Sequence, residues 1–143
     1  MEGVKTVFII APLENTTEDE VKDVIQKAKL KYCEMNHIHD DDVEFLDTLD
    51  HRQFLGMFVA NASAEVYKED FGKIVDKSFG MVDMTNKRAW LINTGSIVAA
   101  LAAFKDGEDF VVFTPGWKKS SMCKILSDVC IEYNIPTTYL NEV

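Results

Sequence analysis

The stretch from Asp109 to Tyr139, DFVVFTPGWKKSSMCKILSDVCIEYNIPTTY, constrains the fold most strongly. An apolar run at 110–113 is followed by a Thr-Pro-Gly-Trp turn, a segment with helical periodicity and a short run at 137–139. Such runs on either side of a helical segment are typical of a βαβ unit. Its strands are parallel, and a right-handed crossover places the loop 115–121 at the carboxyl edge of the sheet. Ligands of open α/β sheets bind at that edge.

The N-terminal part of the chain predicts a second unit of the same kind. Residues 4–11, VKTVFIIA, form the continuous apolar run expected of a strand covered on both faces, and Pro12 ends it. Residues 17–20, TEDE, have the pattern of a capping box. Apolar residues then recur at helical spacing and predict a helix to about Asn36: Val21, Val24, Ile25, Ala28 and Tyr32.

Residues 42–49, DVEFLDTL, are predicted as the second strand, with Asp47 and Asp50 at its carboxyl end. The preceding HIHDDD at 37–42 contains metal-ligating side chains. Histidines one residue apart point in different directions on most backbones, so we interpret this segment as a polar loop and expect no metal site.

The middle of the chain, residues 50–104, is the least regular. Residues 51–66 are consistent with a short helix or with a loop over the ligand edge. Apolar residues at Val66, Phe71, Ile74 and Val75 predict a helix that ends at Gly80. The Ala-rich segment 86–104 predicts a helix buried in the core or against a second subunit.

Length and charge limit the protein class. At 143 residues we expect one domain over 1–143, an α/β three-layer sandwich whose mostly parallel, flavodoxin- or Rossmann-like sheet has about four to five strands.

The formal charge of −9 argues against a nucleic-acid partner. No apolar run is long enough to span a bilayer, and residues 1–10 lack the features of a signal peptide. An odd number of cysteines without metal-ligand spacing favours the cytoplasm.

Both ends of the chain resemble the nucleoside 2-deoxyribosyltransferase-like superfamily. VFIIAPL is similar to the opening strand and Gly-Pro turn of that superfamily, and the 109–140 segment resembles its second half: an Asp, an apolar strand, a Pro-Gly-Trp loop, Ser-x-Gly and a helix. The match covers about a third of the chain. The resemblance implies that the protein forms a dimer or higher homo-oligomer and needs no cofactor.

The residues that depart from the pattern of the superfamily include the one on which its reaction depends. Ala11 replaces the turn glycine, Met122 replaces the glycine of Ser-x-Gly, and Leu126 stands where the superfamily has its nucleophilic glutamate. That glutamate forms a covalent glycosyl-enzyme, a reaction that requires a carboxylate. We expect Leu126 to face inward on an apolar stripe that includes Ile125 and Tyr133. Catalysis by the mechanism of the superfamily is therefore not expected.

Binding does not need the glutamate. The N–H groups at Ser120 and Ser121, with Lys118 nearby, predict an anion site for a phosphate, and Trp117 is suited to stack on a base. Asp109, a candidate hydrogen-bond acceptor for a sugar, is also the one weak catalytic candidate. Taken singly, each is equally explained as a cap, a solvated lysine, a core aromatic or a turn residue. The predicted ligand-binding residues are Ala11, Pro12, Leu13, Asp109, Pro115, Gly116, Trp117, Lys118, Ser120 and Ser121.

Three functions follow from this sequence. The first is non-catalytic binding or sequestration of a nucleoside or nucleotide-like small molecule at the carboxyl edge. The second is cleavage or transfer of an N-glycosidic bond by a displaced carboxylate, for which the candidates are Asp109, Asp83, Asp50 and Glu14. The third is an oligomeric interaction protein that uses the apolar surface of residues 50–104. The first hypothesis is the one we prefer.

Overall fold

The structure is a computed structural model of the 143-residue chain. It describes residues 5–14, 16–51, 75–76, 81–82, 84–85, 87–102, 104 and 109–140. The predicted helix over 66–80 lies outside these ranges except for Val75 and Asp76, as do Asp83 and all but His51 of the 51–66 segment.

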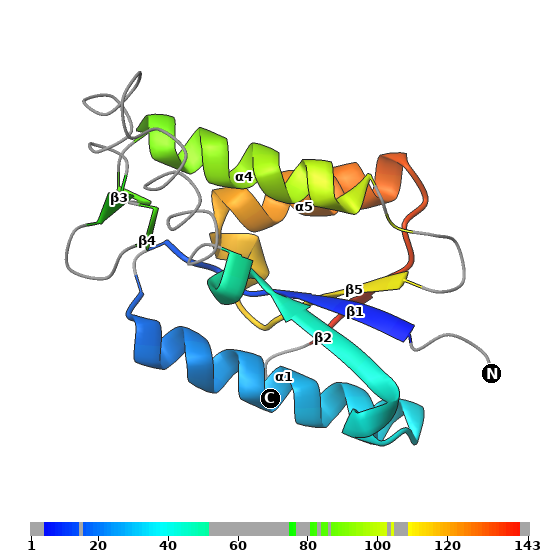
Figure 1. The fold of residues 1–143 in the computed structure, drawn as a ribbon. Helices are drawn as coiled ribbons and strands as arrows, with labels where there is room; N and C mark the ends of the chain where they lie inside the picture. Colours follow the sequence, from blue (N-terminus) through cyan, green and yellow to red (C-terminus); the bar gives the residue numbers. More distant parts are fainter. Residues whose placement is uncertain are drawn as a thin grey trace, which may run out of the picture.

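A four-stranded sheet in the order β2-β1-β5-β6 forms the centre of the molecule (Figure 1). Its strands are β1 (Lys5–Ile10), β2 (Val43–Asp47), β5 (Asp109–Phe113) and β6 (Thr137–Tyr139). Every neighbouring pair in this sheet is parallel, and Ile10 of β1 lies opposite Phe113 of β5. The predicted α/β class with a parallel, Rossmann-like sheet is confirmed.

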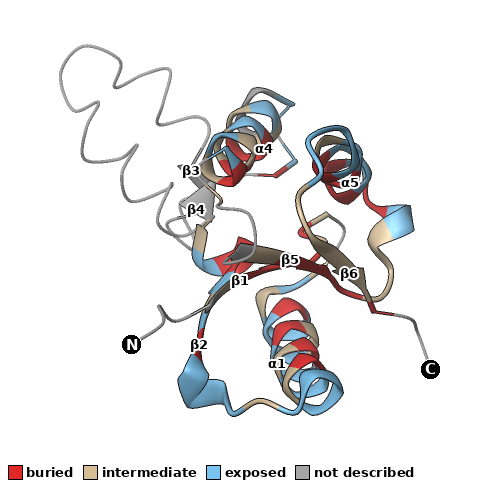
Figure 2. Cartoon of the chain, turned by 90° about the vertical axis from the view of Figure 1, so that its right-hand side faces the viewer, coloured by how far each residue is buried: buried red, intermediate tan, exposed pale blue. Residues whose placement is uncertain are grey.

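Strand β1 is buried because helices cover both faces of the sheet. Val7, Phe8, Ile9 and Ile10 are each at most 2% exposed, as expected for a parallel strand in the middle of such a sheet. Figure 2 shows α1 (Glu18–Asn36) on one face, and α4 (Lys87–Leu101) and α5 (Ser121–Glu132) on the other. The three-layer arrangement is therefore present.

Helix α1 begins where the sequence predicts. The Thr17 hydroxyl accepts a hydrogen bond from the Glu20 N–H at 3.2 Å, and the Glu20 carboxylate accepts one from the Thr16 hydroxyl at 2.8 Å. Its buried residues are Val21, Ile25, Ala28 and Tyr32. The helix ends at His37, whose left-handed backbone (φ 52°) places its N–H on the carbonyls of Cys33 and Glu34.

Helix α5 is rotated relative to the predicted apolar stripe. Met122, Leu126 and Cys130 are fully buried, which confirms that Leu126 faces inward. Ile125 and Tyr133 are 42% and 73% exposed and do not belong to the buried face. The reason is that Ser127 turns inward, where its hydroxyl and that of Tyr139 on β6 lie 2.7 Å apart. Helix α4 confirms the helix predicted over 86–104, although Leu91 on its outer side is 53% exposed.

Two further boundaries differ from the sequence-based expectation. Strand β2 ends at Asp47 because the Asp47 carboxylate accepts a hydrogen bond from the Asp50 N–H at 2.7 Å, which starts a helical turn at Thr48. Val75 lies in β3 (Val75–Asp76), not in a helix, because it pairs with Val82 of the antiparallel β4 (Met81–Val82). None of the helices in the described ranges is long and apolar enough to cross a membrane.

We predict that Thr48→Val destabilises the protein. The buried Thr48 hydroxyl donates to the Ala11 carbonyl at 2.9 Å and accepts from the Ala11 N–H at 3.1 Å. Valine has nearly the same shape but leaves both buried backbone groups unsatisfied, which costs about 2 kcal/mol. Urea unfolding measures the change in unfolding free energy. The control is Thr138→Val, at a half-buried position of β6, where we expect a change within about 0.5 kcal/mol. Equal stability of the two variants would contradict the role of Thr48.

Candidate functional site

The carboxyl edge of the sheet has a topological switch point between β1 and β5. These strands are neighbours, but α1 follows β1 on one face of the sheet and α5 follows β5 on the other. The loops after the two strands therefore diverge, and in open α/β sheets ligands bind in the crevice at such a switch point. We call the region between the segments 11–14 and 114–120 the crevice.

Glu14 spans this crevice. The hydroxyl of Ser120 donates a hydrogen bond to Glu14 Oε1, and the Ser121 N–H donates to Oε2 at 3.1 Å. The Ser120 oxygen also accepts from the Cys123 N–H at 3.1 Å, which makes Ser120 the N-cap of α5. The anion at the start of this helix is thus a carboxylate of the chain itself, in the position where the sequence predicted a phosphate.

Three residues of the predicted 11–13 segment are largely enclosed. Ala11 and Leu13 are at most 3% exposed, and Pro12 is half-buried. Both backbone groups of Ala11 bond to Thr48, so its N–H is not free to donate to a ligand. This segment therefore lies at one side of the crevice, and the carboxylate of Glu14 is the charged group beside it.

The loop after β5 holds the predicted Pro-Gly-Trp motif. Gly116 has φ 86°, a left-handed conformation that favours glycine, and Pro115 and Gly116 are half-buried. The Trp117 ring packs against Tyr139, with centroids 4.8 Å apart, and against Phe113 at 5.6 Å. The ring is half-buried, and the exposed Lys118 ammonium lies 5.8 Å from its centroid. Trp117 therefore closes an aromatic cluster and keeps part of its surface accessible.

Asp109 lies at the opposite end of β5 from these residues. It is the first residue of the strand and pairs with Thr6, four positions before Phe113. Four residues of a parallel strand span about 13 Å. The direction of the strand thus places the Asp109 backbone at the amino edge, away from the crevice. Of the other candidate carboxylates that the structure describes, Asp50 is exposed in the turn after β2, and Glu14 bonds to α5.

Three buried polar atoms lack a hydrogen-bond partner among the described residues: Asn93 Oδ1, Thr94 Oγ1 and Thr114 Oγ1. Thr114 directly follows β5, and its N–H bonds to the Ile10 carbonyl at the end of β1 at 3.2 Å. Asn93, on α4, lies against the first turn of α5, where its Nδ2 is 3.8 Å from Met122 Sδ. Unsatisfied buried groups are rare in native proteins and call for an explanation. The signal in the sequence is a polar residue next to an apolar run.

The second strand adds a histidine and a carboxyl to the same edge. His51 Nε2 lies 2.9 Å from Ser96 Oγ on α4, and burial lowers the pKa of His51. Burial, together with the nearby charge of Asp50, raises the pKa of Asp47. Burial also raises the pKa of Cys123 to about 12 and that of Cys130 to about 11, so both remain thiols at neutral pH and are poor nucleophiles.

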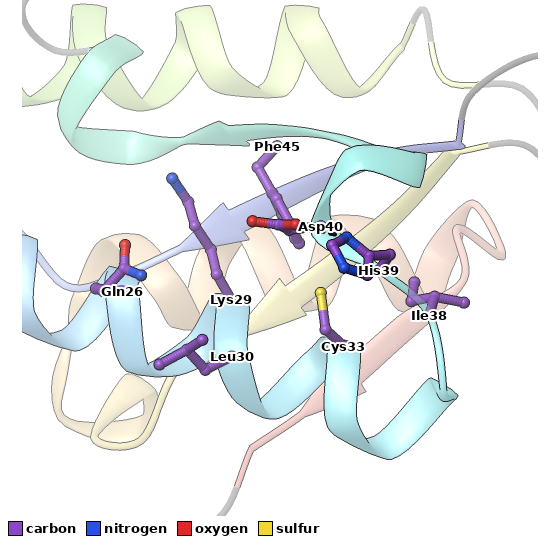
Figure 3. A pocket seen from close by; sticks show the side chains of 8 residues that line it. All are labelled: Gln26, Lys29, Leu30, Cys33, Ile38, His39, Asp40 and Phe45. Atoms are coloured by element: carbon purple, nitrogen blue, oxygen red, sulfur yellow. Dashed lines mark ion pairs between the residues drawn. The ribbon is translucent and has the colours of Figure 1, made fainter.

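Two cavities lie away from the crevice. One, of about 490 Å³, is formed between α1 and β2, and Figure 3 shows the Cys33 thiol, Lys29 and Asp40 at its wall. The other, of about 420 Å³, is an apolar groove between α4 and α5 lined by Val98, Leu101, Ala102, Phe104, Val129, Tyr133 and Ile135. Both groups of residues lie toward the amino edge of the sheet, because they precede β2, β5 and β6 in the chain.

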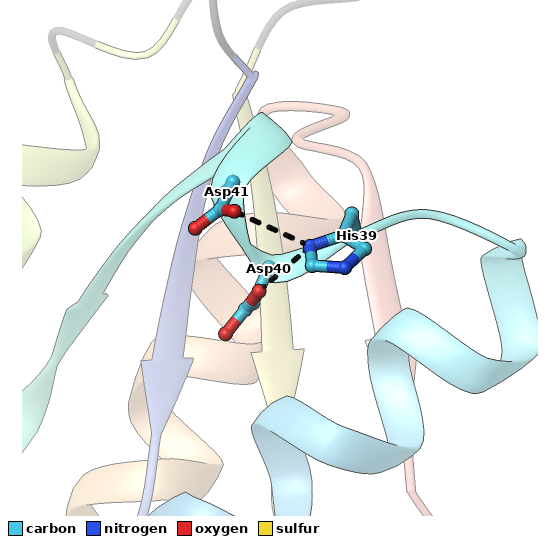
Figure 4. Close-up of side chains that lie close together, drawn as sticks. All are labelled: His39, Asp40 and Asp41. Carbon is cyan, nitrogen blue, oxygen red and sulfur yellow. Dashed lines mark ion pairs between the residues drawn. The ribbon is translucent and has the colours of Figure 1, made fainter.

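A histidine and two aspartates at the start of β2 form the one potential metal-binding group among the described residues. Figure 4 shows His39 Nδ1 facing Asp40 and Asp41, at 3.0 and 3.5 Å from their carboxylate oxygens. All three side chains are exposed. Surface groups of this kind form ion pairs in water without a metal, and the absence of a metal site in residues 37–42 stays a prediction.

Comparison of the chain with protein-family models, with curated proteins and with solved structures found no match. The resemblance to the deoxyribosyltransferase-like superfamily therefore stays a prediction from motifs, and the site is described from its own geometry.

We predict that Asp47→Asn stabilises the protein at pH 7. A carboxyl whose pKa is raised in the folded state contributes stability that is fully present below the unfolded pKa of about 3.9 and is lost as the pH rises through the folded value. Asparagine keeps the oxygen that accepts from Asp50 and has no charge to bury. We expect a gain of about 1 kcal/mol, or about 2–4 °C in Tm.

Thermal unfolding followed by circular dichroism at pH 7 and pH 4 measures this effect, and the gain should shrink at the lower pH. The matched control is Asp128→Asn, which removes an exposed carboxylate from α5. A loss of stability in Asp47→Asn at pH 7 would show that the charge of Asp47 is needed in the folded state.

Proposed function

We propose that the protein binds a nucleoside- or nucleotide-type small molecule at the carboxyl edge of its sheet and does not cleave it. The observation that carries the proposal is the switch point between β1 and β5, from which α1 and α5 diverge to opposite faces. Such a crevice is the usual ligand site of this architecture. The fold alone does not determine a ligand, so the proposal also depends on the side chains at the crevice.

The unsatisfied polar atoms support a binding role. Thr114 and Asn93 are fully buried and stand beside the ends of β5 and the first turn of α5. A buried polar atom without a partner costs about 1–3 kcal/mol. A ligand with hydroxyl or amino groups that reaches these atoms on entering the crevice offsets that cost. Purely structural residues at these positions would be more stable as valine or leucine.

The nucleoside class is supported by the motif at 109–140 that resembles the deoxyribosyltransferase-like superfamily. The half-buried Trp117 keeps part of an aromatic face for a base, and the Lys118 ammonium lies close to the ring. The residue at position 126 supports the proposal that the ligand is not cleaved, because it is Leu126 and not a carboxylate. It is fully buried in the second turn of α5, so no carboxylate stands at the position where the superfamily has its nucleophile.

A second function, cleavage of an N-glycosidic bond, is favoured by one observation. Glu14 is a carboxylate in the crevice itself. Its two oxygens both accept hydrogen bonds from the start of α5, so one lone pair of each oxygen is already engaged. We therefore assign Glu14 to binding and treat cleavage as the alternative.

A further part of the proposal is that the protein forms an oligomer and that the apolar groove between α4 and α5 belongs to the contact surface. Tyr133 and Leu91 are 73% and 53% exposed, and α4 carries no charged residue between Ala89 and Leu101. We propose that a second copy of the chain covers this surface. The three free cysteines fit the reducing cytoplasm that the composition favours.

We predict that Thr114→Val makes the free protein more stable and weakens ligand binding. The variant removes a buried hydroxyl that has no partner among the described residues, and it also removes a contact for the ligand. We expect a gain of up to about 1 kcal/mol in unfolding free energy and about a tenfold loss of affinity. Calorimetric titration with nucleosides, 5′-monophosphates, dinucleotides and cyclic nucleotides measures binding, with Thr138→Val as the control. A Thr114→Val variant that binds the ligand as tightly as the wild type would show that the Thr114 hydroxyl does not contribute to binding.

The cleavage alternative has its own test. We expect no free base when the protein is incubated at high concentration with nucleosides and 5′-monophosphates, because the crevice lacks a free nucleophilic carboxylate. Chromatography of the products detects base release, and Glu14→Gln is the comparison. Base release by the wild type that disappears in Glu14→Gln would replace the binding proposal with a glycosidase.

A further inference from the structure

We infer that the cavity between α1 and β2 binds a free α-amino acid with an apolar side chain. This site is separate from the crevice, and the inference does not depend on the proposed function. The cavity has a volume of about 490 Å³ and is lined by residues of α1 and of the segment 38–45 (Figure 3). Small-molecule sites usually have volumes of about 300–1,000 Å³. The side chains at the wall of the cavity determine which ligand it takes.

Part of this wall is apolar. Ile38 and Phe45 are half-buried there, whereas Leu30 is 62% exposed. The half-buried thiol of Cys33 lies at the same wall, where it acts as a small apolar group. An exposed leucine near an aromatic ring leaves apolar surface in water, and an apolar ligand side chain that covers this surface is stabilised by the hydrophobic effect. The wall therefore favours a ligand with an apolar body.

Lys29 supplies a positive charge to the cavity. Its side chain extends from α1 toward β2 and is half-buried, and its ammonium lies 5.7 Å from the centre of the Phe45 ring. No ion pair joins Lys29 to a carboxylate among the residues that the structure describes. A partly desolvated ammonium is stabilised by an anion that enters with the ligand. The α-carboxylate of an amino acid is an anion of this kind.

Asp40 supplies a negative charge to the same cavity from the turn before β2. Its Oδ1 lies 3.0 Å from His39 Nδ1, which leaves Oδ2 for a ligand. Asp40 is exposed, so water weakens its attraction for a cation. One ammonium and one carboxylate that do not pair with each other match the two charges of a zwitterion. The α-carboxylate of the ligand thus binds Lys29, and its α-ammonium binds Asp40.

The test uses phenylalanine and two analogues that each lack one of its charges. Phenylpropionate lacks the ammonium, and phenethylamine lacks the carboxylate. Titration calorimetry compares the binding of the three compounds to the wild type, Lys29→Gln and Asp40→Asn. The matched controls are Lys31→Gln and Asp41→Asn, which remove exposed charges from α1 and from the turn before β2 at positions that do not line the cavity.

We expect the wild type to bind phenylalanine with a Kd below about 1 mM, about tenfold more tightly than phenethylamine and about threefold more tightly than phenylpropionate. Lys29→Gln should weaken the binding of phenylalanine by about tenfold, and Asp40→Asn by about threefold because Asp40 is exposed. Both control variants should bind phenylalanine as the wild type does. The net charge of −9 would by itself favour the cationic phenethylamine, so this order of affinities is specific to the cavity.

Cys33 reports whether the ligand occupies the cavity. N-ethylmaleimide alkylates accessible thiols, and Cys33 is half-buried whereas Cys123 and Cys130 are buried. Phenylalanine at about ten times its Kd should slow the modification of Cys33 by about tenfold, which intact mass and peptide mapping measure. If the reagent does not modify Cys33 in the free protein, the loss of affinity in Lys29→Gln relative to Lys31→Gln locates the site instead.

Three results would overturn the inference. The first is that the wild type does not bind phenylalanine at concentrations up to about 10 mM. The second is that either analogue binds as tightly as phenylalanine, or that Lys29→Gln binds phenylalanine as tightly as Lys31→Gln does. The third is binding heat without protection of a Cys33 thiol that the reagent modifies in the free protein. None of these results concerns the crevice, so the proposed function is tested separately.

Discussion

The structure depends on the burial of β1 between two parallel neighbours and two layers of helices. Residues 7–10 of β1 are at most 2% exposed, as expected of a central strand, and β2 and β5 pair with it on either side. Parallel pairing requires the chain to cross over after each strand. The crossovers place α1 and α5 on opposite faces, and the loops after β1 and β5 therefore diverge at the carboxyl edge.

Local sequence patterns predicted the elements well where periodicity and capping agree. The strand at residues 5–10, the helix that begins after Thr17 and the strand at 137–139 all follow from apolar runs and end signals. The patterns fail where a side-chain hydrogen bond decides the end or the orientation of an element. Asp47 ends β2 by capping the next turn, and Ser127 turns α5 toward Tyr139, so Ile125 and Tyr133 face outward.

The candidate site was predictable as a location but not as a set of interactions. The βαβ pattern indicates the carboxyl edge, and the Pro-Gly-Trp turn indicates the loop. The sequence does not show that Glu14 meets Ser120, because the two are separated by most of the chain. Nor does it show that Asp109 begins its strand at the far edge, which depends on strand direction. Sequence motifs specify residue types, and the fold decides which of them meet.

The separation between Glu14 and Ser120 has a consequence for synthesis of the chain. The hydrogen bond joins residues 106 positions apart, and β1 gains its β5 neighbour only when the last quarter of the protein has left the ribosome. Long-range pairing of this kind slows folding and leaves apolar strand edges open in the meantime. The nascent chain therefore carries a strongly apolar β1 without its β5 neighbour for most of its translation. A premature stop before residue 109 would leave a fragment with no crevice and an edge prone to aggregation.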